Sequence, residues 1–309
     1  MMELLLHDRI NIIKDTINKY GEQNFYLSFS GGKDSTILHY LLDIALPNNR
    51  IPRVFINTGI EYDAIVKFVK ELSEKDDRFT VILPTNPIKK TLETYGYPFK
   101  SKQHSHNLAI YQHSGINWSV KRYLGFVESN TIFRCPKILN YQFTPNFDIK
   151  CSDKCCLKLK KEPIQKWEKV NGKTIAILGL RQGEGRQRAS HKGCAVFKGN
   201  DLVKFKPLNP ITDEWEEWFI EKYNIKLCEL YYPPFSFKRT GCKGCPFALQ
   251  LQDQLDVMKE LLPKEYLQCE VIWKPVYDEY RRIGYRLHKP THCEQLNLFN
   301  ELQSSSKEK

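Results

Sequence analysis

The apolar positions at the front of the chain follow two different spacings. Near the N-terminus they recur every three or four residues and stop before Gly21, which predicts an amphipathic helix; its apolar residues are Leu6, Ile10, Ile13 and Ile17. Further on, short runs rich in aromatic and β-branched residues predict strands at residues 24–30, 53–57, 79–84 and 174–180. Because amphipathic helical segments separate these runs, we expect an α/β fold with a doubly wound, mostly parallel sheet and a site at the carboxyl ends of its strands.

The pattern becomes less regular behind residue 95 and then largely helical toward the C-terminus. In the segment DEWEEWFIEKY the side chains of Trp215, Trp218 and Phe219 share one helical face, which is typical of a packing stripe. All ten cysteines lie behind residue 134, so the chain has a cysteine-free front and a cysteine-rich back. We expect a nucleotide-binding part at 1–150, a cysteine-rich part at 151–300, and a frayed tail at 301–309.

The composition narrows the classes of partner. The 309 residues include 47 Lys and Arg against 36 Asp and Glu, a formal net charge of +11, which favours an anionic partner such as a nucleotide or a nucleic acid over a merely solvated basic surface. No apolar run approaches the ~18 residues of a membrane span, so no membrane partner is expected. No secretory signal is recognisable, so we expect a cytoplasmic protein whose cysteines bind metal or do redox chemistry rather than form disulfides.

The segment SFSGGKDST, from Ser28 to Thr36, joins a predicted strand to a predicted helix. Backbone amides and a helix N-terminus can hold an anion in this context. Gly31 and Gly32 allow the backbone to approach oxygen atoms, and Lys33 adds a charge; the hydroxyl donors are Ser30, Ser35 and Thr36. The loop is not a Walker A motif. A plain strand–turn–helix capped by Asp34 is the alternative, but it needs fewer of these groups.

Two cysteine pairs stand far apart along the chain. Cys155 and Cys156 are adjacent, and Cys242 and Cys245 form a CxxC. Four thiolates from two loops can hold an iron–sulfur cluster or zinc, or remain unliganded. Adjacent cysteines point in different directions, which suits the separate iron atoms of a cluster better than one tetrahedral ion.

These motifs resemble a known family. SGGKDS is similar to the pyrophosphate loop of the adenine nucleotide alpha-hydrolase-like (PP-loop) superfamily, and Thr58 and Gly59 in FINTGIEYD resemble its second strand and turn. The Cys-Cys…Cys-x-x-Cys pattern resembles that of adenylyl-sulfate reductases in the phosphoadenosine phosphosulfate (PAPS) reductase family. AILGLRQGEGRQR resembles that family's strand leading to an oxyanion-binding arginine, best matched by Arg181, with Arg186 and Arg188 nearby. Arginine's planar fork suits phosphate or sulfate oxygens.

The resemblance implies an adenine nucleotide alpha-hydrolase-like sheet that binds ATP or an adenylyl-sulfate-type nucleotide, with or without Mg. It implies catalytic roles for Lys33 and Arg181, and nucleotide binding by Ser30, Gly31, Gly32, Lys33, Asp34, Ser35, Thr36, Thr58 and Gly59. It also implies a [4Fe-4S] cluster on Cys155, Cys156, Cys242 and Cys245, with zinc as the lesser alternative, and an electron donor such as thioredoxin.

Two features depart from a plain sulfonucleotide reductase. The SGGKDS loop is intact, as in ATP-using members, and the C-terminal ECGLH motif of the reductases is missing; Cys293 stands between His292 and Glu294 instead. The first hypothesis is therefore sulfonucleotide reduction or related sulfur chemistry. The second is ATP-dependent sulfur transfer onto nucleic acid, of the DNA phosphorothioation or tRNA thiolation type, which the charge and the loop favour. The third is a non-catalytic nucleotide-binding accessory protein.

Overall fold

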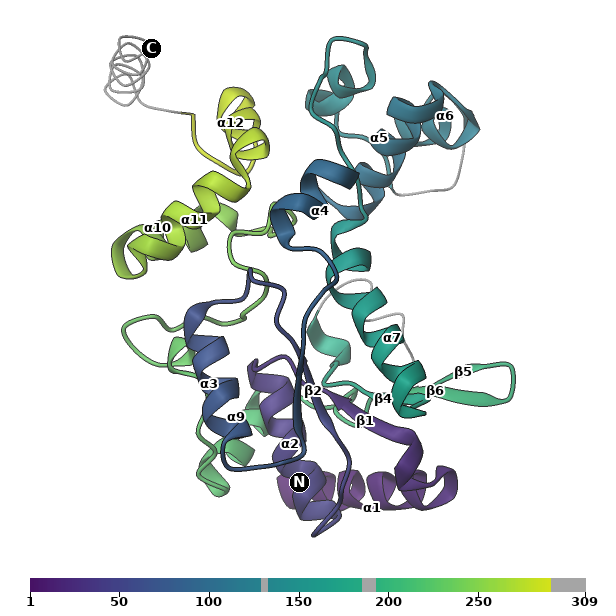
Figure 1. The fold of residues 1–309 in the computed structure, drawn as a ribbon, viewed down its shortest axis with the longest axis vertical. Helices are drawn as coiled ribbons and strands as arrows, with labels where there is room; N and C mark the ends of the chain where they lie inside the picture. Colours follow the sequence, from purple (N-terminus) through teal and green to yellow (C-terminus); the bar gives the residue numbers. More distant parts are fainter. Residues whose placement is uncertain (129–132, 185–192, 290–309) are drawn as a thin grey trace. The chain divides into compact units, whose positions relative to one another are not determined.

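A six-stranded sheet organises the fold of the computed structural model, which describes residues 1–128, 133–184 and 193–289 (Figure 1). The strand order is β3-β2-β1-β4-β6-β5, and every neighbouring pair is parallel except β5 and β6. The strands are β1 (Phe25–Ser28), β2 (Arg53–Ile56), β3 (Phe79–Ile82), β4 (Ile175–Ile177), β5 (Ala195–Lys198) and β6 (Asp201–Phe205). The predicted doubly wound, mostly parallel α/β sheet is confirmed, and its antiparallel hairpin β5–β6 is an element that the sequence did not predict.

The sheet reverses its direction of growth at β1. Strands β2 and β3 lie on one side of β1, and β4 and β6 lie on the other side. Leu27 of β1 pairs with Ile177 of β4. The loops that follow β1 and β4 therefore open side by side at the carboxyl end of the sheet. This is the place where ligands bind in open α/β folds.

The residues of the chain divide into two compact units, each held together by its own contacts. Unit 1 consists of residues 1–87 and 158–242, and unit 2 of residues 88–157 and 243–309. Each unit thus draws on both halves of the sequence, and the boundary expected at residue 150 falls within unit 2. No helix in the described part of the chain is long and apolar enough to span a bilayer.

The helices of unit 1 cover the sheet. They are α1 (Met2–Tyr20), α2 (Lys33–Ala45), α3 (Asp63–Ser73), α7 (Glu162–Asn171) and α9 (Asp213–Lys222), with short turns η1 (Glu22–Asn24), η3 (Leu157–Lys161), η4 (Gln182–Glu184) and η5 (Glu229–Tyr231). Helix α1 ends at Gly21, whose φ of 79° is a backbone conformation that glycine favours, as predicted. On α9 the rings of Trp215 and Phe219 are buried and stacked 4.8 Å apart, so the packing stripe is confirmed.

Unit 2 is helical in its described part. Its helices are α4 (Ile88–Tyr95), α5 (Lys102–Ser114), α6 (Trp118–Leu124), α10 (Leu251–Leu261), α11 (Pro263–Ile272) and α12 (Lys274–Ile283), with the 3-10 turn η2 (Lys137–Phe143). Aromatic rings fill much of its interior, such as Phe99 against Tyr280 with centroids 4.6 Å apart. Both ring nitrogens of the buried His104 have partners, the Tyr123 hydroxyl at 3.0 Å and the Gln142 side chain at 2.7 Å.

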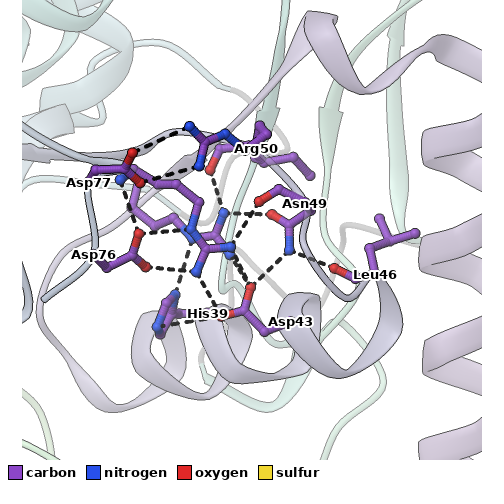
Figure 2. A network of polar contacts seen from close by, with 10 residues as sticks. His39, Asp43, Leu46, Asn49, Arg50, Asp76 and Asp77 are labelled. Carbon is purple, nitrogen blue, oxygen red and sulfur yellow. Dashed lines mark hydrogen bonds and ion pairs between the residues drawn. The ribbon is translucent and has the colours of Figure 1, made fainter.

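A buried polar network ties α2 of unit 1 to β2 and to the turn before β3 (Figure 2). The guanidinium of Arg53 is fully buried and donates to Asp43 at 2.6 Å, to Asn49 at 2.7 Å and to the His39 ring at 3.1 Å. Arg78 reaches the same Asp43 carboxylate at 2.8 Å. This network satisfies a charge inside the unit, because each buried polar group finds a partner.

Candidate nucleotide site

A cavity of about 1160 Å³ opens in unit 1 at the carboxyl ends of β1 and β4. It is lined by the loop after β1 and the start of α2, by residues 178–183 after β4, by residues 209–214 and Glu217, by Tyr231, and by residues 238–240. The cavity thus lies at the switch point of the sheet, where the sequence places the glycine loop.

The two glycines of the loop are required by close neighbours. Gly31 has a φ of 72°, and a Cβ there would lie 2.8 Å from a methyl carbon of Ile65 on α3. A Cβ on Gly32 would lie 3.2 Å from the hydroxyl oxygens of Tyr231 and Thr240. The backbone N–H of Lys33 donates to the same Tyr231 hydroxyl at 2.9 Å. The loop is therefore pressed against residues 231–240, which the sequence did not connect with it.

The hydroxyl groups of the loop hold its shape. The Ser30 and Ser35 oxygens lie 3.0 Å apart, and the hydroxyls of Ser35 and Thr36 donate to the carbonyl of Gly32 at 2.9 and 3.0 Å. Ser30 and Ser35 line the cavity together with Gly32, Lys33 and Asp34, whereas Gly31 and Thr36 do not. Five of the seven predicted loop residues thus face the cavity.

Gly179, which follows β4, brings the second loop against the first. A Cβ there would lie 3.0 Å from the backbone carbon and oxygen of Asp34, so a larger residue would push the two loops apart. The loop that carries Arg181 thereby reaches the N-terminus of α2. Arg186 and Arg188 lie outside the described residues.

Five charged side chains meet at this junction. The ammonium of Lys33 lies 2.8 Å from Glu216 Oε2, and the Arg181 Nε lies 3.1 Å from Glu216 Oε1 and 3.2 Å from Asp34 Oδ1. The Arg181 Nη2 donates to Asp213 at 2.7 Å. Arg181 therefore lines the cavity, and three carboxylates surround its guanidinium, while its role at a phosphate or sulfate stays a prediction.

The proton affinities of these groups follow from burial and from their neighbours. Burial, and next the adjacent Asp34 carboxylate, raise the pKa of Glu216 to about 8. Burial acts to lower the pKa of Arg181, but the attraction of Glu216 and the other carboxylates outweighs it, so this pKa is raised. The hydrogen bond from Arg181 lowers the pKa of Asp213. At this junction Arg181 is held in its charged form, and Glu216 binds a proton more readily than an exposed carboxyl does.

Thr58 and Gly59 follow β2 and do not line the cavity. The backbone N–H and the hydroxyl of Thr58 both donate to the buried carboxylate of Glu61 at 2.8 Å, which closes the turn before α3. Gly59 has a φ of 80°, the conformation that this turn needs. These residues shape the turn, and their contact with a nucleotide stays a prediction.

The four predicted metal-binding cysteines are divided between the two units: Cys155, Cys156 and Cys245 belong to unit 2, whereas Cys242 is the last residue of unit 1. In residues 1–128, 133–184 and 193–289 no group of three or more His, Cys, Asp or Glu side chains is placed to hold a metal ion. A shared metal site on these four thiols therefore stays a prediction. Cys293 lies outside the described residues.

Each end of the CxxC has its own anchor. In unit 1, burial acts to lower the pKa of Lys160, but the Cys242 sulfur and the Glu61 carboxylate raise it overall, so this lysine stays charged beside the thiol. In unit 2 the carbonyls around Cys245 are hydrogen-bonded by aromatic side chains: Trp273 donates to Lys243, Tyr277 to Gly244 and Tyr280 to Pro246, at 3.2, 2.5 and 3.0 Å. The backbone that carries Cys245 is therefore held rigidly within its unit.

Four residues at or beside the junction were not predicted from the sequence: Asp213, Glu216, Tyr231 and Thr240. Glu216 directly follows Trp215 on the helix whose apolar stripe was predicted, and a charged residue beside such a stripe is a signal that could have raised the question. Tyr231 and Thr240 give no comparable signal, because their connection to Gly32 and Lys33 depends on the path of an irregular segment.

Comparisons with known proteins bear on the same residues. The model of the phosphoadenosine phosphosulfate reductase domain matches residues 24–122 and 131–248. An uncharacterized protein of Methanocaldococcus jannaschii is 25% identical over 289 residues, which are 92% of this chain and 54% of the relative, so the chain spans about half the length of that protein.

Solved structures with a similar fold have low identity. A phosphoadenylyl-sulfate reductase from Candida auris in complex with phosphate is 12% identical with a TM-score of 0.43, over 75% of this chain and 93% of that chain. A U34-tRNA thiolase from Methanococcus maripaludis with its [4Fe-4S] cluster is 14% identical with a TM-score of 0.37, over 89% of this chain and 80% of that chain.

Proposed function

The chain belongs to the phosphoadenosine phosphosulfate reductase domain family, and from this premise we propose that it is an enzyme that acts at the alpha phosphate, or at a sulfate joined to it, of a bound adenine nucleotide. The observation that carries the proposal is the cavity at the switch point of the sheet, with Ser30, Gly32, Lys33 and Ser35 on its wall. Hydroxyls, a glycine backbone and an ammonium at a helix N-terminus suit the phosphate groups of a nucleotide.

The residues of the loop have separable tasks in this proposal. The loop holds the distal phosphates, and Lys33 stabilises the negative charge that develops when pyrophosphate leaves. Arg181 places positive charge at the second loop, where the alpha phosphate or the sulfate would lie. Its three carboxylate neighbours fix its orientation, so it acts as a positioned rather than a mobile cation.

Two substrates distinguish the reaction classes. With ATP, an acceptor attacks the alpha phosphorus, the bond to the bridging oxygen breaks, and pyrophosphate leaves. With adenylyl sulfate, two electrons from a thiol donor of the thioredoxin type reduce the sulfate group, and sulfite and AMP leave. The complete loop with Lys33 favours ATP, and the net charge of +11 favours a nucleic acid as the acceptor.

We expect pyrophosphate release from ATP, and more of it when tRNA or DNA is added. The measurement is a coupled pyrophosphate assay on anaerobically purified protein, beside an assay for sulfite release from adenylyl sulfate with reduced thioredoxin. Sulfite release without pyrophosphate release would assign the chain to sulfonucleotide reduction. If the protein binds nucleotide but releases neither product, it is a non-catalytic nucleotide-binding accessory protein.

The cluster is a separate prediction, and no step above uses it. The donor set of Cys155, Cys156, Cys242 and Cys245 suits a [4Fe-4S] cluster, which would supply electrons or handle sulfur when bound. We expect about four iron atoms per chain after anaerobic purification, and their loss in C242S. The matched control is C228S, which removes a buried thiol of unit 1 outside the motif. One zinc per chain, or a full iron content in C242S, would contradict the assignment.

A further inference from the structure

The carboxylate of Glu216 lies behind the cavity wall, where it pairs with the lining residues Lys33 and Arg181, but it has no task in the proposed reaction. It is fully buried on the first turn of α9. In the described part of the chain neither of its oxygens accepts a hydrogen bond of ordinary geometry. Its polar neighbours are Lys33 and Arg181, with which it forms ion pairs, and the carboxylate of Asp34. A buried ionised carboxylate that depends on two cations is costly whenever one of them moves away.

The charges that face Glu216 come from three elements. Helix α2 contributes Lys33 and Asp34, the segment after β4 contributes Arg181, and α9 itself contributes Asp213. When all five groups are ionised, two positive charges face three negative ones. Above pH 8, where Glu216 is ionised, these five groups therefore carry a net negative charge, which opposes the binding of a polyanion even though Lys238 and Arg239 also line the cavity.

Protonation of Glu216 removes this unfavourable net charge. Phosphate oxygens compete with Glu216 for the ammonium of Lys33, which has a fifth of its side chain exposed and lines the cavity. Asp213 is largely exposed and therefore screened by water, and Asp34 has its own contact with Arg181. Of the three carboxylates, Glu216 is the one that loses a partner and has no access to solvent. A proton on Glu216 brings the five groups to neutrality and releases Lys33.

We propose that Glu216 is a positioning residue that takes up a proton from solvent when the phosphates of the nucleotide draw Lys33 away, so that nucleotide binding and protonation of Glu216 are linked. This inference rests on the proposed nucleotide site. It assigns to the junction a second property, a pH-dependent affinity for polyphosphates.

The direction of the linkage follows from the environment. The pKa of Glu216 in the ligand-free protein is raised to about 8 by burial and by Asp34. Bound phosphates add negative charge and remove Lys33, so this pKa rises further in the complex. Below pH 8 the carboxyl is protonated in both states and the affinity changes little. Above pH 8 binding requires proton uptake, and the affinity falls as the pH rises.

The test is the affinity for α,β-methylene ATP, which cannot lose pyrophosphate, measured by calorimetry between pH 7.0 and 9.0. For the wild type we expect Kd to increase about eightfold between pH 7.5 and 9.0, with uptake of roughly 0.7 proton at pH 8.5 in buffers of different ionisation enthalpy. E216Q, which cannot ionise, should show a change of less than about twofold over the same range. E221Q removes an exposed charge near the far end of the same helix, away from the cavity wall, and should keep the wild-type slope.

The outcomes separate the inference from the proposed function. A flat wild-type profile without proton uptake, or a wild-type slope in E216Q, overturns the role of Glu216 even when binding is tight. If E216Q fails to fold, the number of protons that the wild type takes up on binding still tests the role of Glu216. Absence of binding at every pH, in contrast, contradicts the proposed nucleotide site itself.

Discussion

The variant K33M is expected to release pyrophosphate from ATP at least a hundredfold more slowly than the wild type, with a free energy of unfolding within about 1 kcal/mol of the wild-type value at pH 7. The loss of rate follows from the position of Lys33, on the cavity wall at the start of α2. The small change in stability follows from Glu216. Its raised pKa keeps the carboxyl largely protonated at pH 7, so removal of the ammonium leaves no buried charge uncompensated, and Arg181 remains beside it.

The measurements are the steady-state rate of pyrophosphate release and urea unfolding of the same protein. K222M is the control, because Lys222 lies at the far end of α9, pairs with Glu3 and does not line the cavity. Its rate should equal that of the wild type. Parallel losses of rate and stability in K33M would mean that Lys33 holds the fold together at Glu216 rather than acting on the nucleotide.

The elements that the sequence predicted are those whose signal is local. Four of the six strands and the helix ending at Gly21 follow from apolar spacing and from a residue that stops a helix. The hairpin β5–β6 escaped prediction because β5 is an edge strand whose side chains are mostly exposed, so its sequence lacks the apolar run of the central strands. A buried strand can be recognised in the sequence by its apolar run, and an exposed edge strand does not need one.

In the candidate site, too, the residues marked by a local motif were predicted and those brought in by the tertiary fold were not. The glycine loop and Arg181 were predicted because a motif marks each of them. The partners that set their charge state, Glu216 above all, come from a segment that only the fold brings to the loop. The cysteines lack such support, because their spacing in the sequence suggests one cluster but the four residues belong to two units, so the cluster stays a prediction. Spacing predicts which atoms are chemically suited to a ligand, and the tertiary fold decides which of them meet.

The variant R53M is expected to lower the free energy of unfolding by about 3 to 5 kcal/mol, the typical cost of breaking a buried ion pair on one side. Arg53 is fully buried on β2, and three side chains accept hydrogen bonds from its guanidinium, Asp43, Asn49 and His39 (Figure 2). A methionine of similar length fills the space but leaves the buried acceptors of Asn49 and His39 without this donor, whereas Asp43 keeps Arg78. The measurement is urea unfolding at pH 7, with the unfolding midpoint and slope compared with those of the wild type.

The same network contains its control. Arg50 pairs with Asp77 at 3.3 Å, and three quarters of each side chain is exposed, so R50M should cost less than about 0.5 kcal/mol. A second readout separates loss of the buried charge from loss of packing. Burial, and next the charge of Arg53, lower the pKa of His39 to about 4, so removal of that charge should raise this pKa in R53M. Equal stability of R53M and R50M would show that Arg78 alone suffices to hold Asp43, and that the buried guanidinium is dispensable to the unit that carries the nucleotide site.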